Sequence, residues 1–369
     1  MKRVRTLFRI LVGIVFIFSG FVKGIDPLGT VYRMQDYFLA FGTTWANDFA
    51  LPLTIFLCIL EFILGISLLF NLWIRMSAWV LLPMMTSFTI LTFFDAFYNL
   101  VPDCGCFGDA IKMNNTETFI KNVVLMALVI PIFIWRKRYK SLLNPTGDLL
   151  VLGMATILFT GLSFYCLWHL PVIDFREWRK GAQVNQASEL PIRFFVTYKN
   201  RHTGETGEFL APDYPWNDST WLSDWIFVSQ RVEDPNQDNL ALMIEDSLEN
   251  DLARTFLDIP DYHFFVVVYN LDAADREALV RLQPLYQAVS EAGYSFIGLT
   301  GTLPEKVAAF QGETGVSIPF YSSDDVVLKS MIRSNPGLIL LKDGVVIEKW
   351  HYHDFPDWQE VKKKYIDAR

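Results

Sequence analysis

Residues 49–70 read FALPLTIFLCILEFILGISLLF, and Glu61 is the single charged side chain in this apolar stretch. The hydrocarbon core of a bilayer is roughly 30 Å thick and needs about 20 predominantly apolar residues in a helix. The stretch therefore predicts a transmembrane helix. Four further stretches come close to the same length and composition: Val4–Val22, Met76–Tyr98, Ile120–Trp135 and Leu149–Leu170. We expect an α-helical transmembrane bundle of about five helices before residue 171.

Charge is distributed unevenly along the 369 residues. Up to Leu170 there are 13 Lys and Arg against 9 Asp and Glu, and beyond it 19 against 31, so the two parts carry +4 and −12. Nucleic-acid phosphates are bound by clustered Lys and Arg, and the acidic part has no such cluster. We therefore expect the lipid bilayer, and no nucleic acid, as a partner.

Basic residues in the short connections predict the orientation of the helices, because such loops stay in the cytoplasm. They precede the first helix and follow the second and the fourth, at Lys2, Arg3, Arg5, Arg75, Arg136, Lys137, Arg138 and Lys140. With five helices, the loops 24–48 and 99–119 and everything after Leu170 lie on the opposite side. The predicted location is a bacterial inner membrane, with the N-terminus cytoplasmic and the C-terminal part periplasmic.

Residues 176–235 are predicted to form a small β-rich element after the fifth helix. The stretch 176–189 is polar enough for a linker, and the apolar stretches 192–198 and 207–210 flank a turn-rich segment typical of a hairpin. Trp221–Val232 is expected to add a further strand.

Residues 236–369 show strands that alternate with helical stretches, a pattern typical of an α/β sheet. We expect strands at His263–Tyr269, Ser295–Leu299, Gly337–Leu341 and Val345–Trp350, and helices at Asp275–Ala292, Leu303–Thr314 and Asp357–Ile366. The last two strands are joined by Lys342-Asp343-Gly344, and Asp-Gly is a strong hairpin signal. This order resembles a thioredoxin-like domain.

The segment Ser334-Asn335-Pro336-Gly337 is the most specific part of that resemblance, which implies a cis-proline at Pro336. Where the family has Cys-x-x-Cys, this chain has Asp272-Ala273-Ala274-Asp275. A thiolate is the nucleophile in disulfide exchange and a carboxylate cannot replace it. We expect the domain to be redox-inert by itself, with Asp275 capping the helix that follows.

Cys104 and Cys106 lie in the loop Val101–Asp109, on the side predicted to be oxidising. Two cysteines separated by one glycine form a redox-active pair if their disulfide is strained and easily exchanged. A structural staple would stabilise little, because the closed loop is so short. Free thiols, or metal ligands together with Asp103 and Asp109, are the other readings, although the spacing fits no zinc pattern.

Glu61 is the most informative ionisable residue, since charged groups at membrane depth tend to face a partner or a cavity inside the bundle. Lys23 and Asp95 are nearer the helix ends, where solvation makes them less telling, and Lys121 is expected to reach the interface. Cys58 and Cys166 are single cysteines in apolar surroundings, typical of inert buried residues. Exchange of either with the loop pair stays open.

Three segments resemble the membrane family that joins methylamine utilisation protein MauE to the DoxX proteins. Residues 13–23, GIVFIFSGFVK, look like its first-helix signature, Glu61 falls where its second helix carries an acid, and Cys104–Gly108 is similar to the cysteine loop of the MauE branch. The resemblance implies a four-helix membrane domain over 1–143, with 144–175 holding the fifth helix and a linker. It also implies a role in the maturation of disulfide-containing proteins.

Three functions follow from these observations. The first is a membrane redox-associated protein in which Cys104 and Cys106 exchange disulfides with a periplasmic thiol-disulfide protein, supported by Glu61 and Pro336. The second is a non-catalytic anchor whose periplasmic domain recruits a partner. The third is a transporter, which is poorly supported because many transporters are built from internal repeats and five helices without such a repeat are expected here. The sequence identifies no metal site and no cofactor. The general plan allows a quinone, for which there is no motif.

Overall fold

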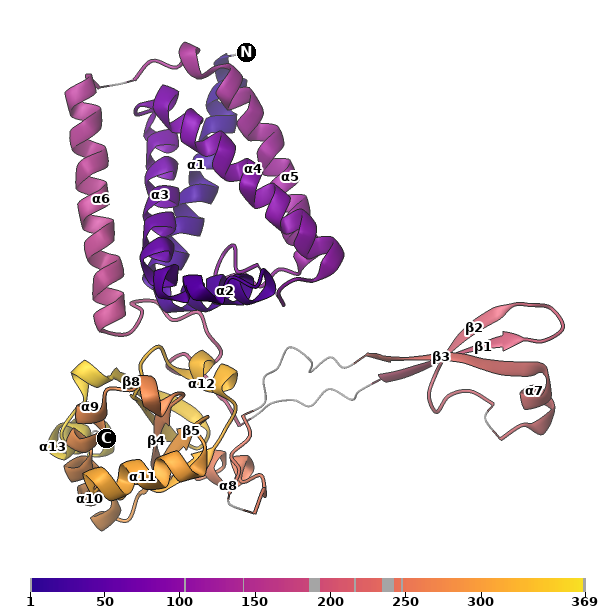
Figure 1. The fold of residues 1–369 in the computed structure, drawn as a ribbon, viewed down its shortest axis with the longest axis vertical. Helices are drawn as coiled ribbons and strands as arrows, with labels where there is room; N and C mark the ends of the chain where they lie inside the picture. Colours follow the sequence, from indigo (N-terminus) through magenta and orange to yellow (C-terminus); the bar gives the residue numbers. More distant parts are fainter. Residues whose placement is uncertain are drawn as a thin grey trace.

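The computed structural model describes residues 2–102, 104–141, 143–185, 193–215, 217–233, 242–246 and 248–367. Figure 1 shows a bundle of long helices, an α/β domain at one end of it, and a small sheet that lies apart from both. We call the end of the bundle that faces the α/β domain the domain-side end.

Within the described residues, five helices are long and apolar enough to cross a membrane, which confirms the predicted bundle. They are α1 (Lys2–Ile25), α3 (Ala50–Phe70), α4 (Ile74–Tyr98), α5 (Asn115–Ile134) and α6 (Pro145–Trp168). The protein is therefore a membrane protein.

Glycines bring α1 and α3 into backbone contact. A Cβ atom added at Gly20 would lie 2.6 Å from the Phe62 nitrogen, and one at Gly65 would lie 2.5 Å from the Ile17 nitrogen. Small residues allow such close approach between membrane helices. This seam fixes Ser19 and Lys23 of α1 against Glu61 of α3.

A helix that the sequence did not predict crosses the domain-side end. The loop expected at 24–48 contains α2 (Pro27–Ala40) and the 3-10 helix η1 (Thr44–Phe49), and α2 lies across the bundle between it and the α/β domain (Figure 1). Asp26 caps α2 by accepting a hydrogen bond from the Gly29 N–H, and Pro27 occupies a first-turn position. At 14 residues α2 is too short to span a bilayer.

The α/β domain contains a five-stranded sheet in the order β6-β5-β4-β7-β8. Its strands are β4 (Tyr262–Val268), β5 (Ser295–Thr300), β6 (Phe320–Ser322), β7 (Gly337–Lys342) and β8 (Val345–His351). β4, β5 and β6 run parallel, whereas β7 is antiparallel to both β4 and β8. This mixed order is thioredoxin-like, and the peptide bond before Pro336 is cis, as the resemblance implies.

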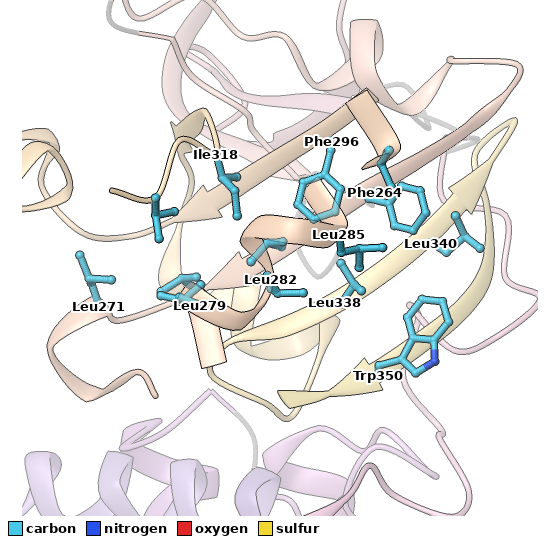
Figure 2. Close-up of a cluster of buried hydrophobic side chains, with 14 of the residues drawn as sticks. Phe264, Leu271, Leu279, Leu282, Leu285, Phe296, Ile318, Leu338, Leu340 and Trp350 are labelled. Carbon is cyan, nitrogen blue, oxygen red and sulfur yellow. The ribbon is translucent and has the colours of Figure 1, made fainter. Parts of the chain in front are cut away.

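Apolar side chains cover both faces of the central strand. Phe264 belongs to one core cluster with Leu279 and Leu338, which Figure 2 shows, and Phe265 belongs to a second cluster on the opposite face. The helices that surround the sheet are α8 (Ala253–Leu257), α9 (Arg276–Arg281), α10 (Gln283–Glu291), α11 (Pro304–Thr314), α12 (Asp325–Met331) and α13 (Trp358–Val361).

The domain differs from the sequence expectation in three places. The single helix expected at 275–292 is divided into α9 and α10, because Pro284 lies in the first turn of α10 and has no N–H for a continuous helix. The helix expected at 357–366 changes to a π-helix at Lys362–Ile366. Strand β6 and the helices α8 and α12 were not predicted.

The segment 176–185, expected to be a linker and the start of the β-rich element, belongs instead to the α/β domain. Gln183 bridges Val345, the Gly181 N–H donates to the Val346 carbonyl, and the Trp178 side chain is buried in the second core cluster. The segment is polar in composition, but it pairs with the edge strand β8 and buries Trp178, and these contacts place it in the domain.

The small sheet has the order β2-β1-β3, from β1 (Arg193–Asn200), β2 (Thr206–Leu210) and β3 (Trp225–Glu233). The strand expected at 221–232 begins as the short helix α7 (Ser219–Asp224), which Asp218 caps. The predicted boundary between residues 235 and 236 lies outside the described residues.

Candidate functional site

A cavity of about 160 Å³ lies at the domain-side end of the bundle. One water occupies about 30 Å³ of liquid, so the cavity has room for several waters or a small organic group. Helices α1 to α5 and the loop 99–114 contribute its walls, with apolar residues such as Phe16, Met85 and Phe88 and the polar residues Ser19, Lys23, Arg33, Tyr37, Cys58, Glu61, Cys104, Cys106 and Lys121.

Cys104 and Cys106 lie next to each other at the cavity. Their Sγ atoms are 3.5 Å apart, both are free thiols, and both residues are partly exposed. Gly105 and Gly108 take positive φ angles of 62° and 51°, which glycine adopts without steric penalty. The two sulfurs thus lie close together, and the redox role of the pair stays a prediction.

The neighbouring aromatic residue fixes this loop against the helices. The Phe107 ring centroid lies 5.4 Å from that of Phe18, and Lys121 Nζ lies 4.4 Å from the Phe107 centroid. Lys121 therefore points toward the loop and lines the cavity rather than reaching only for the interface.

Glu61 faces the cavity and is 2% exposed. It pairs with Lys23, and Ser19 Oγ lies 2.8 Å both from Glu61 Oε2 and from the carbonyl oxygen of Cys106. A hydroxyl has one proton, so Ser19 donates to one of these oxygens at a time. The expectation that Glu61 has a partner inside the bundle is confirmed.

Lys23 and Asp95 are more deeply buried than their positions near the helix ends predicted. The Lys23 side chain is 11% exposed and Asp95 is fully buried. The Tyr37 hydroxyl of α2 donates to Asp95 Oδ2 at 2.5 Å. Helix α2 covers the end that the sequence analysis expected to be solvated, and this cover is why the expectation was wrong.

The two thiols differ electrostatically. Hydrogen bonding from Cys104, opposed by burial and assisted by the Lys121 and Lys23 ammonium groups, lowers the pKa of Cys106 to about 6. The pKa of Cys104 is raised, first by that same hydrogen bond and then by burial, although its contact with Tyr37 lowers it. The surroundings of Cys106 thus favour its thiolate over that of Cys104, and a thiolate is the reactive form.

The other two cysteines differ in position. Cys58, one turn before Glu61, lines the same cavity and is buried, whereas Cys166 of α6 is buried but does not line it. Among the described residues, no three His, Cys, Asp or Glu side chains gather in a way that could hold a metal ion. Of the two acids near the loop pair, Asp109 pairs with Arg333 and Asp103 lies outside the described residues.

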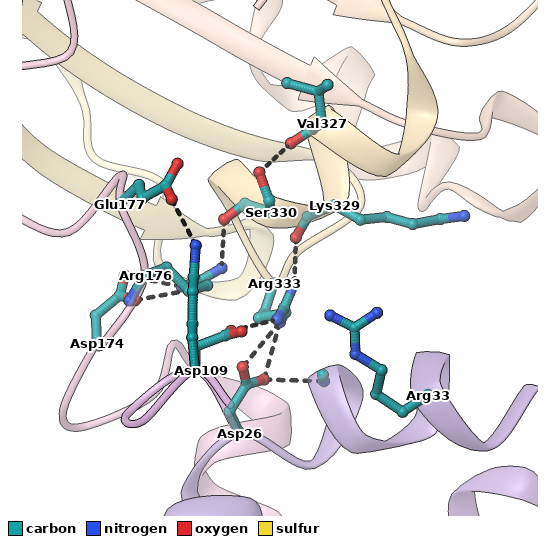
Figure 3. A network of polar contacts seen from close by, with 12 residues as sticks. Asp26, Arg33, Asp109, Asp174, Arg176, Glu177, Val327, Lys329, Ser330 and Arg333 are labelled. Carbon is teal, nitrogen blue, oxygen red and sulfur yellow. Dashed lines mark hydrogen bonds and ion pairs between the residues drawn. The ribbon is translucent and has the colours of Figure 1, made fainter. Parts of the chain in front are cut away.

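The thioredoxin-like domain contacts the bundle through the loop before Pro336. Arg333 Nε lies 2.9 Å from Asp26 Oδ1, and its terminal nitrogen lies 3.1 Å from Asp109 Oδ2 (Figure 3). Burial opposes ionisation of Asp26, but Arg333 holds the pKa of Asp26 below its usual value. On the same interface the hydroxyls of Tyr32 and Tyr269 are 3.2 Å apart.

Pro336 and the position of the missing cysteines lie together, but away from the cavity. The Asp275 N–H donates to the Asn335 carbonyl at 3.1 Å, and Asp275 caps α9 through the Ala278 N–H, as expected. Asp272 pairs with Lys306. Pro336 does not line the cavity, so the structure does not bring it together with the loop pair.

The part of the chain that builds the cavity has a family match. Residues 1–136 match methylamine utilisation protein MauE. We call residues 1–136 the MauE-like bundle; the match covers less than half of the chain, and the DoxX part of the sequence resemblance stays a prediction.

The other comparisons add little to this match. None of the curated proteins matches the chain. A solution structure described as a candidate protein disulfide isomerase from Bacteroides thetaiotaomicron is 16% identical over 33% of this chain and 80% of its own, with a TM-score of 0.27. The strand order, rather than this likeness, carries the thioredoxin-like assignment.

Proposed function

We propose that this protein exchanges disulfides with a periplasmic thiol-disulfide protein, with Cys104 and Cys106 as the exchanging pair. The observation that carries the proposal is the position of two thiols, 3.5 Å apart, at a cavity that also presents the Lys23–Glu61 pair. Perturbed ionisable groups that gather in a cavity are typical of functional sites.

Glu61 supports the chemistry through Lys23. A lone ammonium group buried in a membrane protein loses its proton or moves to water, because burial of an unpaired charge is unfavourable. Glu61 pairs with the Lys23 ammonium group and holds it in place, and the Lys23 charge favours the Cys106 thiolate. The buried acid is thus an electrostatic support for the thiol pair.

The thioredoxin-like domain has a non-redox role in this proposal. Its cysteine positions hold Asp272 and Asp275, and the loop before its cis-proline contacts the bundle through Arg333. The domain therefore covers the domain-side end, and electrons pass through the loop pair alone. We place this end in the periplasm of a bacterial inner membrane, so that a periplasmic reporter fused after Arg369 is active and a cytoplasmic one is not.

Trapping the redox state of the loop pair in cells tests the function. Acid quenching followed by alkylation with a mass-tagged maleimide should show both oxidised and reduced forms of Cys104 and Cys106, which shift when the periplasm is made more reducing. Cys166→Ala is the matched control, because Cys166 does not line the cavity. If the pair never changes state and Cys104→Ser with Cys106→Ser retains full function, the protein is a non-catalytic anchor.

A further inference from the structure

The two thiols of the loop pair have different proton environments, and the difference extends beyond the loop. Cys106 faces ammonium groups from two helices, Lys23 of α1 and Lys121 of α5. Cys104 lines the cavity together with Tyr37 of α2, and the Tyr37 hydroxyl donates to Asp95 Oδ2 of α4. One thiol has positive charge beside it, and the other has a path for a proton.

We propose that Cys106 is the nucleophilic thiol and that Tyr37 is a catalytic residue that accepts the proton of Cys104, with Asp95 as its positioning residue and the final acceptor. This inference rests on the proposed function and assigns the roles within that site. The family match names none of these residues.

Asp95 has the vacancy that a proton acceptor needs. The residue is fully buried, and its Oδ1 atom has no hydrogen-bond partner among the described residues, whereas Oδ2 accepts from Tyr37. Buried polar atoms are normally satisfied, and an exception calls for an explanation. A carboxylate that takes up a proton during each exchange provides one.

The carboxylate that lines the cavity, and the arginine beside it, are paired elsewhere. Glu61 of α3 is held by Lys23 and Ser19, and Arg33 of α2 lies 3.7 Å from Asp36. Cys58 of α3 also lines the cavity. Of the carboxylates named, Asp95 is the one connected to Cys104 through a hydroxyl.

The exchange balances with the partner disulfide as oxidant. The Cys106 thiolate attacks one sulfur of that disulfide, so the partner S–S bond breaks, a mixed disulfide forms and one partner thiolate leaves. Cys104 then attacks Cys106 Sγ, so the mixed disulfide breaks and the second partner thiolate leaves, while the Cys104 proton passes to the Tyr37 oxygen and the Tyr37 proton passes to Asp95. The loop pair loses two electrons, and the partner gains two electrons and two protons from solvent as Asp95 returns its proton.

Purified full-length protein with Cys58→Ala and Cys166→Ala, in detergent, allows each step to be timed. The remaining thiols are the loop pair, because the chain has four cysteines. The probe is 4,4′-dithiodipyridine, a small neutral disulfide whose cleavage releases one thiopyridone per step. Attack by Cys106 gives the first release, and ring closure by Cys104 gives the second.

Tyr37→Phe should leave the first release unchanged and slow the second about tenfold at pH 7, less than full removal of positioned proton transfer because water substitutes in part. Its second release should also become steeply pH-dependent, since a proton must then leave to solvent. Asp95→Asn should act in the same direction. Tyr32→Phe, which removes a hydroxyl from the same helix at the domain interface, should change neither step.

An unchanged second release in both Tyr37→Phe and Asp95→Asn overturns the inference, as does mass-spectrometric labelling of Cys104 before Cys106 at one equivalent of alkylating agent. These outcomes are separate from the test of function. A loop pair that cycles in cells but shows no Tyr37 effect removes only the proton path. A pair that shows the two-step asymmetry in detergent but never cycles in cells removes the function.

Discussion

The MauE-like bundle contains a pair of thiols, whereas the thioredoxin-like domain has the sheet of that fold without its cysteines. The bundle holds two thiols beside charged groups in a loop, whereas the domain retains its sheet order and the cis bond at Pro336 but has aspartates at 272 and 275. Apolar clusters on both faces of β4 stabilise the domain, and residues 272 and 275 belong to neither cluster. The sheet order is thus specified by residues other than those at positions 272 and 275, so the fold by itself does not determine the chemistry of the domain.

The largest expected effect comes from serine substitutions made on both sides of this comparison. Cys104→Ser with Cys106→Ser should abolish exchange, because no thiolate remains in the loop. Asp272→Ser with Asp275→Ser should leave exchange unchanged, since serine still caps α9. Alkylation of partner thiols, followed by gel shift, measures both variants. Loss of exchange in the aspartate variant would assign chemistry to the domain.

The next prediction concerns the stability of the bundle, which depends on the buried Lys23–Glu61 pair. Glu61→Gln leaves the Lys23 ammonium buried without its carboxylate, and loss of one partner of a buried pair costs about 3–5 kcal/mol of unfolding free energy. Glu61→Leu with Lys23→Met should cost less, because no charge stays unpaired. Guanidinium unfolding in micelles, followed by tryptophan fluorescence, compares them. Equal losses in both variants would contradict the electrostatic role of Glu61.

Phe264→Ala tests the domain in the same way. It removes a fully buried ring from the core shown in Figure 2 and should destabilise the domain by about 3–5 kcal/mol. Alkylation of Cys106 should not change, because its neighbours all belong to the bundle. Proteolysis of the domain in the full chain measures the first effect, and a change in thiol reactivity would show that the regions are coupled.

A pH prediction sharpens the difference between the two thiols. Cys106 should be alkylated with a midpoint near pH 6, because its lowered pKa makes the thiolate dominant above that pH and loses it below. Lys121→Gln should move the midpoint upward, since one charge that favours the thiolate is removed. Lys112→Gln, which removes an exposed lysine paired with Glu177, should not move it. Site-resolved mass spectrometry across a pH series gives each midpoint.

The smallest effect is expected at the interface between the regions. Tyr32→Phe removes the hydrogen bond to Tyr269 and should weaken docking of the domain by about 1 kcal/mol. Hydrogen exchange around Tyr269 should rise slightly. A large rise would mean that this single contact, rather than the Arg333 ion pairs, holds the domain.

Local signals in the sequence predicted the elements that depend on composition and period. The apolar stretch around Glu61 and the Asp343-Gly344 turn are such signals, and both are where they were expected. Cys104 and Cys106 could be proposed from the sequence, because a thiol pair separated by one glycine is recognisable without a fold, and their role stays a prediction. The resemblance to MauE agrees with the family match over 1–136.

The polar surroundings of the thiols could not be predicted in the same way. Tyr37 and Asp95 are remote in sequence and meet because α2 crosses the end of the bundle. The Asp26-Pro27 start of α2 was a readable helix signal, but a rule that seeks only membrane-length helices passes over it. The segment 176–185 was misassigned because polar composition hides its pairing with β8.

The glycine seam between α1 and α3 has a mechanical consequence. At Gly20 and Gly65 the two backbones leave no space even for a methyl group, so the helices cannot slide past one another without collision. Helices α1 and α3 therefore move as one rigid unit, and Lys23 and Glu61 keep their spacing. In the proposed exchange, the movement that brings the two sulfurs into bonding distance therefore takes place in the loop, at Gly105 and Gly108, while α1 and α3 keep their positions.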